Sequence, residues 1–147
     1  MARVYDVAAF ILSEHGPMTA MKLQKLVYYV QAWSLVWDER PLFNERIEAW
    51  ANGPVSPDLY SAHRGYFIVK PGDISGRVED IDDTGKETIR AVLGYYGDKS
   101  PQWLSDLTHA EAPWRDARQG LPPNVRSNEE ITPAAMAEYY GSLPAEA

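Results

Sequence analysis

The sequence predicts a mainly α protein, a compact helical bundle around a buried central helix at about residues 20–37, with a small β or irregular insertion at about residues 44–78. Two observations lead to this prediction. Residues 20–37 carry apolar side chains on more than one side, which is typical of a helix in the middle of a bundle. Three other segments begin with a hydroxyl residue followed by proline, which is a pattern of helix starts.

The first helix is predicted from apolar residues that recur at helical spacing from Val4 to Leu12, before Gly16 and Pro17 end the pattern. Thr19 is the predicted N-cap of the central helix. One apolar stripe of this helix consists of Leu23, Leu26, Val27, Val30, Ser34 and Trp37, and the other of Met21, Tyr28, Ala32 and Leu35. A helix with two apolar stripes has to be enclosed by neighbours, which places it at the centre.

After the central helix the pattern changes to turns and short strands. Residues 38–41 form a predicted turn, and Ile47–Trp50 alternates as a short strand does. We expect Asn-Gly-Pro at residues 52–54 to break that strand. Residues 65–77 are rich in turn formers around the apolar run 66–69, which indicates an irregular or short-strand excursion.

The remaining segments are predicted to be helices. The three hydroxyl–proline pairs are Ser56-Pro57, Ser100-Pro101 and Thr132-Pro133. In each, the hydroxyl caps a free N–H of the first turn, and proline fits the first helical position because it has no N–H to satisfy. Another helix follows the acidic residues 82 and 83 and ends at Gly97, a shorter one runs from Pro113 towards Gly120, and the last ends at about Tyr140.

Composition restricts the classes of function. The 147 residues include no cysteine, so disulfides and thiolate metal sites are excluded. The net charge of −7 would on average repel a polyanion, so we expect no direct nucleic-acid binding. No apolar run is long enough for a membrane span and no secretory signal is present, so we expect a cytoplasmic protein without a membrane partner.

Residues that could perform catalysis are few. None of the three histidines is spaced i, i+4 from another, and no nucleophile elbow, Walker loop or glycine fingerprint is present. We therefore predict that the chain is not an enzyme and has no catalytic residues, metal site or cofactor. A small metal-dependent hydrolase that uses His63, His109 and Glu111 stays open as a weaker alternative.

One face of the central helix is a candidate for partner binding. Lys22, Lys25 and Tyr29 are spaced i, i+3 and i+7, which places them on the same side. This face could meet an acidic partner surface or ligand. Alternatively, the lysine stems could lie along the bundle and place their ammonium groups beside nearby carboxylates.

Several large side chains lie at turns and element ends, away from the helical stripes. They are Trp50, Pro54, Tyr60 and Trp114. Each could fill a gap between layers or anchor an interface. Together they predict a groove that binds a partner.

Three segments of the chain carry a family resemblance. They are KLQKLVYY at residues 22–29, IEAWANGPV at residues 47–55 and LTHAEAPW at residues 107–114. In this order they resemble the landmarks of the Panacea antitoxin domain, a family first recognised in phage-associated proteins. The resemblance covers nearly the whole chain, so we expect residues 1–147 to form a single Panacea-like antitoxin domain.

The resemblance implies a mostly helical antitoxin that neutralises a cognate protein toxin by direct binding. An adaptor that presents the toxin to a protease is the alternative within the same class, and the oligomeric state stays open. The candidate partner-binding residues are Lys22, Lys25, Tyr29, Trp50, Pro54, Tyr60, His109, Glu111 and Trp114.

Overall fold

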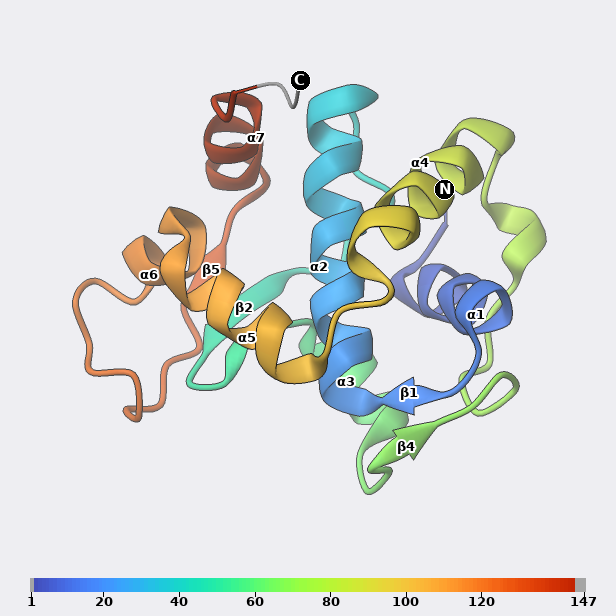
Figure 1. The fold of residues 1–147 in the computed structure, drawn as a ribbon, viewed down its shortest axis with the longest axis horizontal. Coiled ribbons are helices and arrows are strands. Elements are labelled where there is room, and N and C mark those ends of the chain that lie inside the picture. Colours follow the sequence, from blue (N-terminus) through green and yellow to red (C-terminus); the bar gives the residue numbers. More distant parts are fainter. Residues whose placement is uncertain (1, 145–147) are drawn as a thin grey trace.

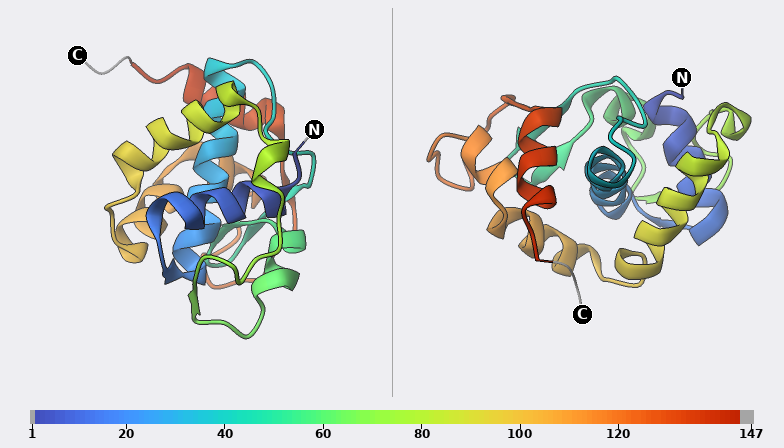
Figure 2. Two further views of the ribbon diagram at one scale, coloured as in Figure 1. Left: turned by 90° about the vertical axis from the view of Figure 1, so that its right-hand side faces the viewer. Right: turned by 90° about the horizontal axis from the view of Figure 1, so that it is seen from above.

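Helix α2 (Ala20–Trp37) is the axis of the fold in a computed structural model that describes residues 2–144 (Figure 1). Seen from above, α2 is viewed end-on with the other elements around it (Figure 2). The helices that contact it most are α1 (Val4–His15), α4 (Asp83–Tyr96), α5 (Pro101–Ala110) and α7 (Pro133–Gly141). The predicted mainly helical bundle with a buried central helix is confirmed.

The predicted helix caps are present. The Thr19 hydroxyl accepts a hydrogen bond from the Lys22 N–H at 3.1 Å. Ser56, Ser100 and Thr132 cap α3 (Pro57–His63), α5 and α7 in the same way, each accepting from the N–H three residues later. The Asp82 carboxylate caps α4 through the Gly85 N–H. Local sequence therefore determines where these five helices begin.

Both apolar stripes of α2 face the interior, except at the ends of the helix. Met21 in the first turn and Trp37 in the last are exposed. Gln31 is buried halfway along, where its side chain accepts from the Leu42 N–H and donates to the Phe43 carbonyl, each at 2.8 Å. These bonds fix the loop that follows α2 against the helix.

The strands form two small antiparallel sheets. The first joins β2 (Ile47–Trp50) to β3 (Gly53–Val55) and β5 (Glu130–Ile131), and the second joins β1 (Met18–Thr19) to β4 (Ile68–Val69). The expected break at residues 52–54 is wrong in detail: the chain turns at residues 51–52, and Gly53 already pairs with Trp50. The partner strands β1 and β5 were not predicted, because two residues are too short to show a pattern.

Two shorter helical elements pack against α1 and against the sheet formed by β2, β3 and β5. A 3-10 turn, η1 (Val78–Asp80), lies against α1, and the Asp6 carboxylate accepts from the Arg77 N–H at 2.7 Å. Helix α6 (Ala112–Ala117) follows α5 and packs on β2 and β5. Across residues 2–144, no helix combines the length and apolar character needed to cross a membrane.

Candidate functional site

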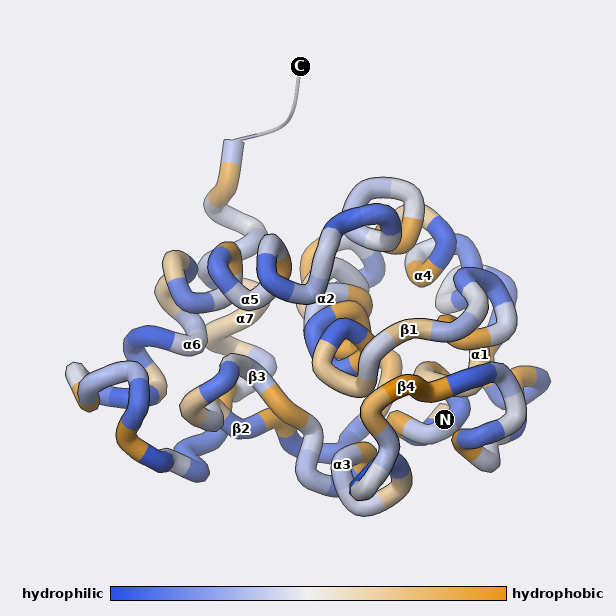
Figure 3. The backbone as a smooth tube through the Cα atoms, turned by 60° about the horizontal axis from the view of Figure 1, so that its bottom comes forward, coloured by the Kyte–Doolittle hydropathy of each residue, from blue (hydrophilic) through white to orange (hydrophobic). Residues whose placement is uncertain are grey.

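A groove of about 450 Å³ lies where the first half of α2 meets the β2–β3 hairpin, α3 and the loop before β4. Figure 3, turned to bring this end of the protein forward, shows these elements around the start of α2. The side chains that form the groove include Met21, Lys25, Trp50, Tyr60 and Phe67. These side chains come from α2, the hairpin, α3 and the loop before β4, so the groove exists only in the folded chain.

Aromatic side chains form the walls of the groove. The rings of Trp50 and Tyr60 meet edge to face with centroids 5.1 Å apart, and the Trp50 indole N–H donates to Glu48 at 2.8 Å. Tyr66 and Phe67 belong to the same lining and are exposed, with 80% of Phe67 accessible. Exposed aromatics gathered in one concavity are characteristic of interaction sites.

Gln24 fixes the position of α3 at the base of the groove. Its side-chain oxygen accepts from the Ser56 N–H at 2.9 Å, and its amide nitrogen donates to the Ser56 carbonyl at 3.2 Å. The same amide lies 2.9 Å from Nε2 of His63. With Nε2 as the acceptor His63 is a neutral imidazole, which agrees with burial lowering its pKa. His63 is thus held as a structural group.

The Lys25 side chain forms the floor of the groove under the hairpin. Gly53 has φ +124°, and a Cβ at this residue would lie only 2.6 Å from Cε of Lys25. The backbone conformation therefore favours glycine, and the end of the Lys25 side chain lies close against it. Lys25 is 2% exposed, and burial lowers its pKa to about 8. Within residues 2–144, no carboxylate lies at ion-pair distance from its ammonium.

One turn further along α2, Tyr29 ends in a closed polar cluster. One carboxylate oxygen of Glu111 accepts from the hydroxyls of Tyr29 and Tyr140, each at 2.7 Å. The hydroxyl oxygens of Tyr28 and Tyr140 lie 3.0 Å apart, so Tyr28 can donate to Tyr140. Burial raises the pKa of Glu111, and the two hydrogen bonds act in the opposite direction. The Tyr29 ring also stacks on Tyr96 at 4.3 Å, which makes the cluster part of the core.

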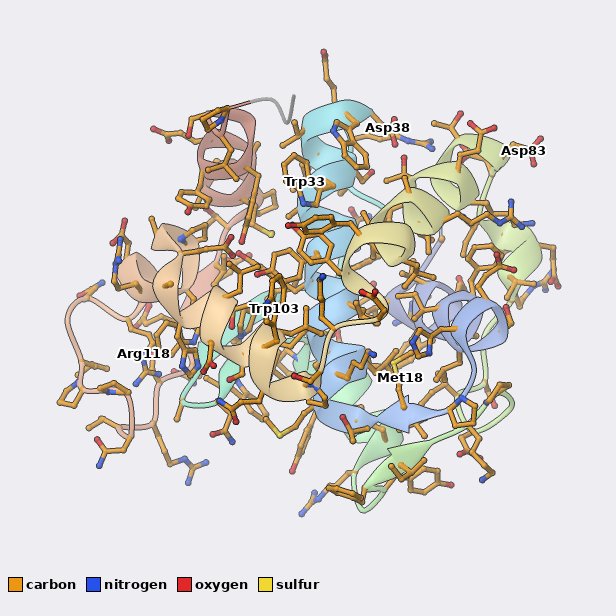
Figure 4. All side chains as sticks on the ribbon, viewed as in Figure 1. Met18, Trp33, Asp38, Asp83, Trp103 and Arg118 are labelled. Carbon is orange, nitrogen blue, oxygen red and sulfur yellow. The ribbon has the colours of Figure 1, made fainter. Side chains whose placement is uncertain are left out.

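Trp114 supports the hairpin from behind. Its indole N–H donates to the Trp50 carbonyl at 2.8 Å, and the His109 ring stacks on it with centroids 4.1 Å apart. The guanidinium carbon of Arg118 lies 4.8 Å from the Trp114 ring, and Nη1 of Arg118 donates to the Ala49 carbonyl at 3.0 Å. Figure 4 labels Arg118 on the side of the protein that carries α6. Trp114 therefore holds the strand that carries Trp50 in place.

The nine candidate partner-binding residues divide by exposure. Lys22, Trp50, Tyr60 and His109 have accessible surface, whereas Lys25, Tyr29, Pro54, Glu111 and Trp114 are buried. The groove brings together Lys25, Trp50 and Tyr60. Tyr29 and Glu111 meet in the tyrosine cluster, and His109 stacks on Trp114 behind the hairpin.

Sequence reasoning missed several members of the groove. Phe67 was part of an apolar run predicted as an irregular or short-strand segment, and its exposed side chain is seen only in the folded chain. Gln24 and Arg64 were also missed, because a single Gln or Arg in a helical segment has no distinguishing pattern. The apolar cluster 66–68 beside the turn at Gly65 was the available signal for an exposed anchor.

The hydrolase alternative finds no support in the arrangement of its three residues. His63 contacts Gln24, His109 stacks on Trp114, and Glu111 accepts from two tyrosines. Across the described residues 2–144, no group of three His, Asp or Glu side chains is placed to hold a metal ion.

Comparison with known proteins adds two findings. The family described as "Antitoxin SocA-like, Panacea domain" matches residues 23–115, which contain most of α2, the hairpin, α3 and α5. A protein named "Antitoxin SocA" from Caulobacter vibrioides (strain NA1000 / CB15N) is 35% identical over 125 residues, covering 74% of this chain. The chain spans 64% of the length of that relative. No solved structure matches the chain.

Proposed function

Because the chain belongs to the antitoxin SocA-like Panacea domain family, we propose that it is the antitoxin of a toxin–antitoxin pair and neutralises a cognate protein toxin by direct binding. The observation that carries this proposal is the position of the family match. It spans residues 23–115, and that range supplies Lys25, Trp50, Tyr60 and Phe67 of the groove. In this proposal the chain acts in the cytoplasm as a binding protein, without catalysis or cofactor.

The surface of the groove suits a protein partner. Trp50 and Tyr60 present large aromatic rings, and such rings anchor interfaces because they bury much area at a low cost in side-chain entropy. Phe67 extends this surface at the rim. Lys22 lies one turn before Lys25 on the same side of α2 and is partly exposed. We propose that these residues contact the toxin.

The buried candidates have a supporting role in this proposal. Tyr29 and Glu111 fix the centre of the bundle, and Trp114 holds the hairpin through the Trp50 carbonyl. Groups that are already rigid before binding lose little conformational entropy when the partner arrives. The tyrosine cluster and Trp114 would then contribute to affinity by keeping the groove in shape.

The direct test is co-expression with the protein encoded by the adjacent reading frame. We expect that protein to arrest growth alone and to be harmless together with this chain, and we expect the two to copurify. A neighbouring protein that is harmless by itself, or whose toxicity persists with this chain, would contradict the proposal.

The half-life of the toxin separates direct neutralisation from delivery to a protease. If the chain covers the toxin, the toxin level should stay constant or rise when the two are co-expressed. A toxin that disappears faster in the presence of this chain, and that is stabilised when the cell's proteases are removed, would identify an adaptor instead.

A further inference from the structure

We propose that the groove receives an acidic side chain of the toxin, whose carboxylate pairs with the Lys25 ammonium while adjacent apolar side chains of the toxin pack on Trp50, Tyr60 and Phe67. This inference rests on the proposed function and assigns a chemistry to the bound segment. The toxin segment would thus carry one Asp or Glu between apolar residues.

In the free protein, Lys25 is buried at the groove without a carboxylate partner from the described residues. Its side chain is 2% exposed, and across residues 2–144 no carboxylate is within ion-pair distance of the ammonium. Removing a charge from water without a counter-ion is costly, which is why buried charges in proteins are normally paired. A lysine whose pKa is about 8 is still mainly protonated at pH 7. Lys25 is therefore an almost wholly buried cation in the lining of an open groove, and no carboxylate of the described part of the chain pairs with it.

The local charge of the groove differs in sign from the net charge of the chain. The whole chain has 21 acidic and 14 basic residues, yet the groove lining contains Lys25 and Arg64 and neither Asp nor Glu. The other titratable groups of the lining are His63, which is neutral, and the phenols of Tyr60 and Tyr66. A basic or neutral side chain at the floor would leave the cation uncompensated, whereas a carboxylate would compensate it.

The Lys25 side chain is also confined. Its end lies close against Gly53, and Thr108 borders the same space. A side chain confined before binding loses less conformational entropy when it pairs, which favours a specific contact. The aromatic walls and a volume of about 450 Å³ leave room for a few side chains, so a short segment of the toxin fits better than a flat domain surface.

The test measures affinity for the protein of the adjacent reading frame by calorimetry, with Lys25→Met and Lys25→Gln variants of the full chain. We expect either variant to bind about 30-fold more weakly or worse. Neither should melt at a lower temperature than the wild type, because each removes an unpaired buried charge. Lys86→Met, a lysine on α4 outside the groove, is the matched control and should bind as the wild type does.

The same experiment identifies the bound residue. Each Asp or Glu of the toxin is changed to Asn or Gln and measured against the wild type and Lys25→Met. We expect one toxin variant to lose as much affinity as Lys25→Met loses, and the double variant to lose little more, because the two groups form one pair. This non-additive result would establish the carboxylate–Lys25 contact.

The possible failures are distinct. A wild-type chain that does not protect against its neighbour overturns both proposals. A chain that protects, and whose Lys25→Met variant binds with unchanged affinity, overturns the acidic occupant alone. Weaker binding of Lys25→Met without any coupled toxin carboxylate also overturns it, including the case where a nucleic acid carried by the toxin provides the anion.

Discussion

Lys25 and Tyr29 lie one turn apart on the same side of α2, but their polar groups have different surroundings. Tyr29 ends in a cluster where Glu111 accepts two hydroxyl hydrogen bonds, and the whole cluster is buried. Lys25 is equally buried but lies under the groove, where no carboxylate of residues 2–144 compensates it. The tyrosine–Glu111 cluster has its hydrogen bonds formed within the core and stabilises the fold. The unpaired lysine, in contrast, lowers the stability of the free protein. Such a residue is explained more readily by a partner.

The largest effect is expected in the scaffold. Tyr29→Ala should lower the free energy of unfolding by about 3–5 kcal/mol, because it removes a buried ring together with a hydrogen bond to Glu111. Tyr29→Phe keeps the ring and should cost about 1.5–3 kcal/mol. Urea denaturation of both variants checks this. If Tyr29→Ala kept its stability and lost toxin binding, Tyr29 would belong to the contact surface instead.

Substitutions in the groove should weaken toxin binding and change stability little. Tyr60→Ala should weaken toxin binding by at least about 30-fold, equivalent to about 2 kcal/mol, while the melting temperature falls little, because the ring is partly exposed. Tyr95→Ala on α4 removes another exposed ring away from the groove and should leave affinity unchanged. Equal losses from both variants would show that the groove is not the contact surface.

Lys25 is expected to have a smaller effect on the free energy of unfolding of the free protein, and this effect is destabilising. Burial lowers its pKa from 10.5 to about 8, so the folded protein binds fewer protons than the unfolded chain between those values. The free energy of unfolding should therefore rise with pH from about 8 to 10.5, and the penalty is complete below pH 8.

The Lys25→Met variant tests whether the buried lysine destabilises the free protein. At pH 7 it should be more stable than the wild type by about 1–2 kcal/mol, less than the full shift implies because relaxation and water recover part of the cost. The gain should shrink as the pH rises above 8. A destabilised variant, or a gain that does not depend on pH, would mean that Lys25 is not buried as a charge.

The elements that could be predicted from the sequence are those determined by residues close together in the chain. Thr19, Ser56 and Thr132 cap helices through bonds that span only three residues, so their patterns are complete within one segment. The two stripes of α2 predicted its central position for the same reason. Strands β1 and β5 were missed because each is two residues long and depends on a partner far along the chain.

The candidate site was predicted only in outline. Trp50 and Tyr60 were identified because large aromatics at element ends are informative alone, and the structure brings them together. The different roles of Lys25 and Tyr29 could not be predicted, because both occupy the same helix face. The difference depends on Glu111, which reaches Tyr29 from 82 residues away and does not reach Lys25.

The smallest expected signal is binding to duplex DNA. With a net charge of −7, the chain alone should bind with a Kd of about 10⁻⁴ M or weaker at physiological salt, because no overall positive field attracts the phosphates. Fluorescence anisotropy with a labelled duplex measures this. A sub-micromolar complex that depends on sequence would show that a local basic face outweighs the average charge.

Melting temperature and toxin affinity should be measured together on Lys25→Met and Tyr29→Phe. The two variants are expected to change in opposite directions. Lys25→Met should melt at a higher temperature and bind the toxin more weakly, whereas Tyr29→Phe should melt at a lower temperature and, while folded, bind as the wild type does. If both variants lost affinity only in proportion to lost stability, Lys25 and Tyr29 would both be scaffold, and the separation between a closed core and an open groove would be refuted.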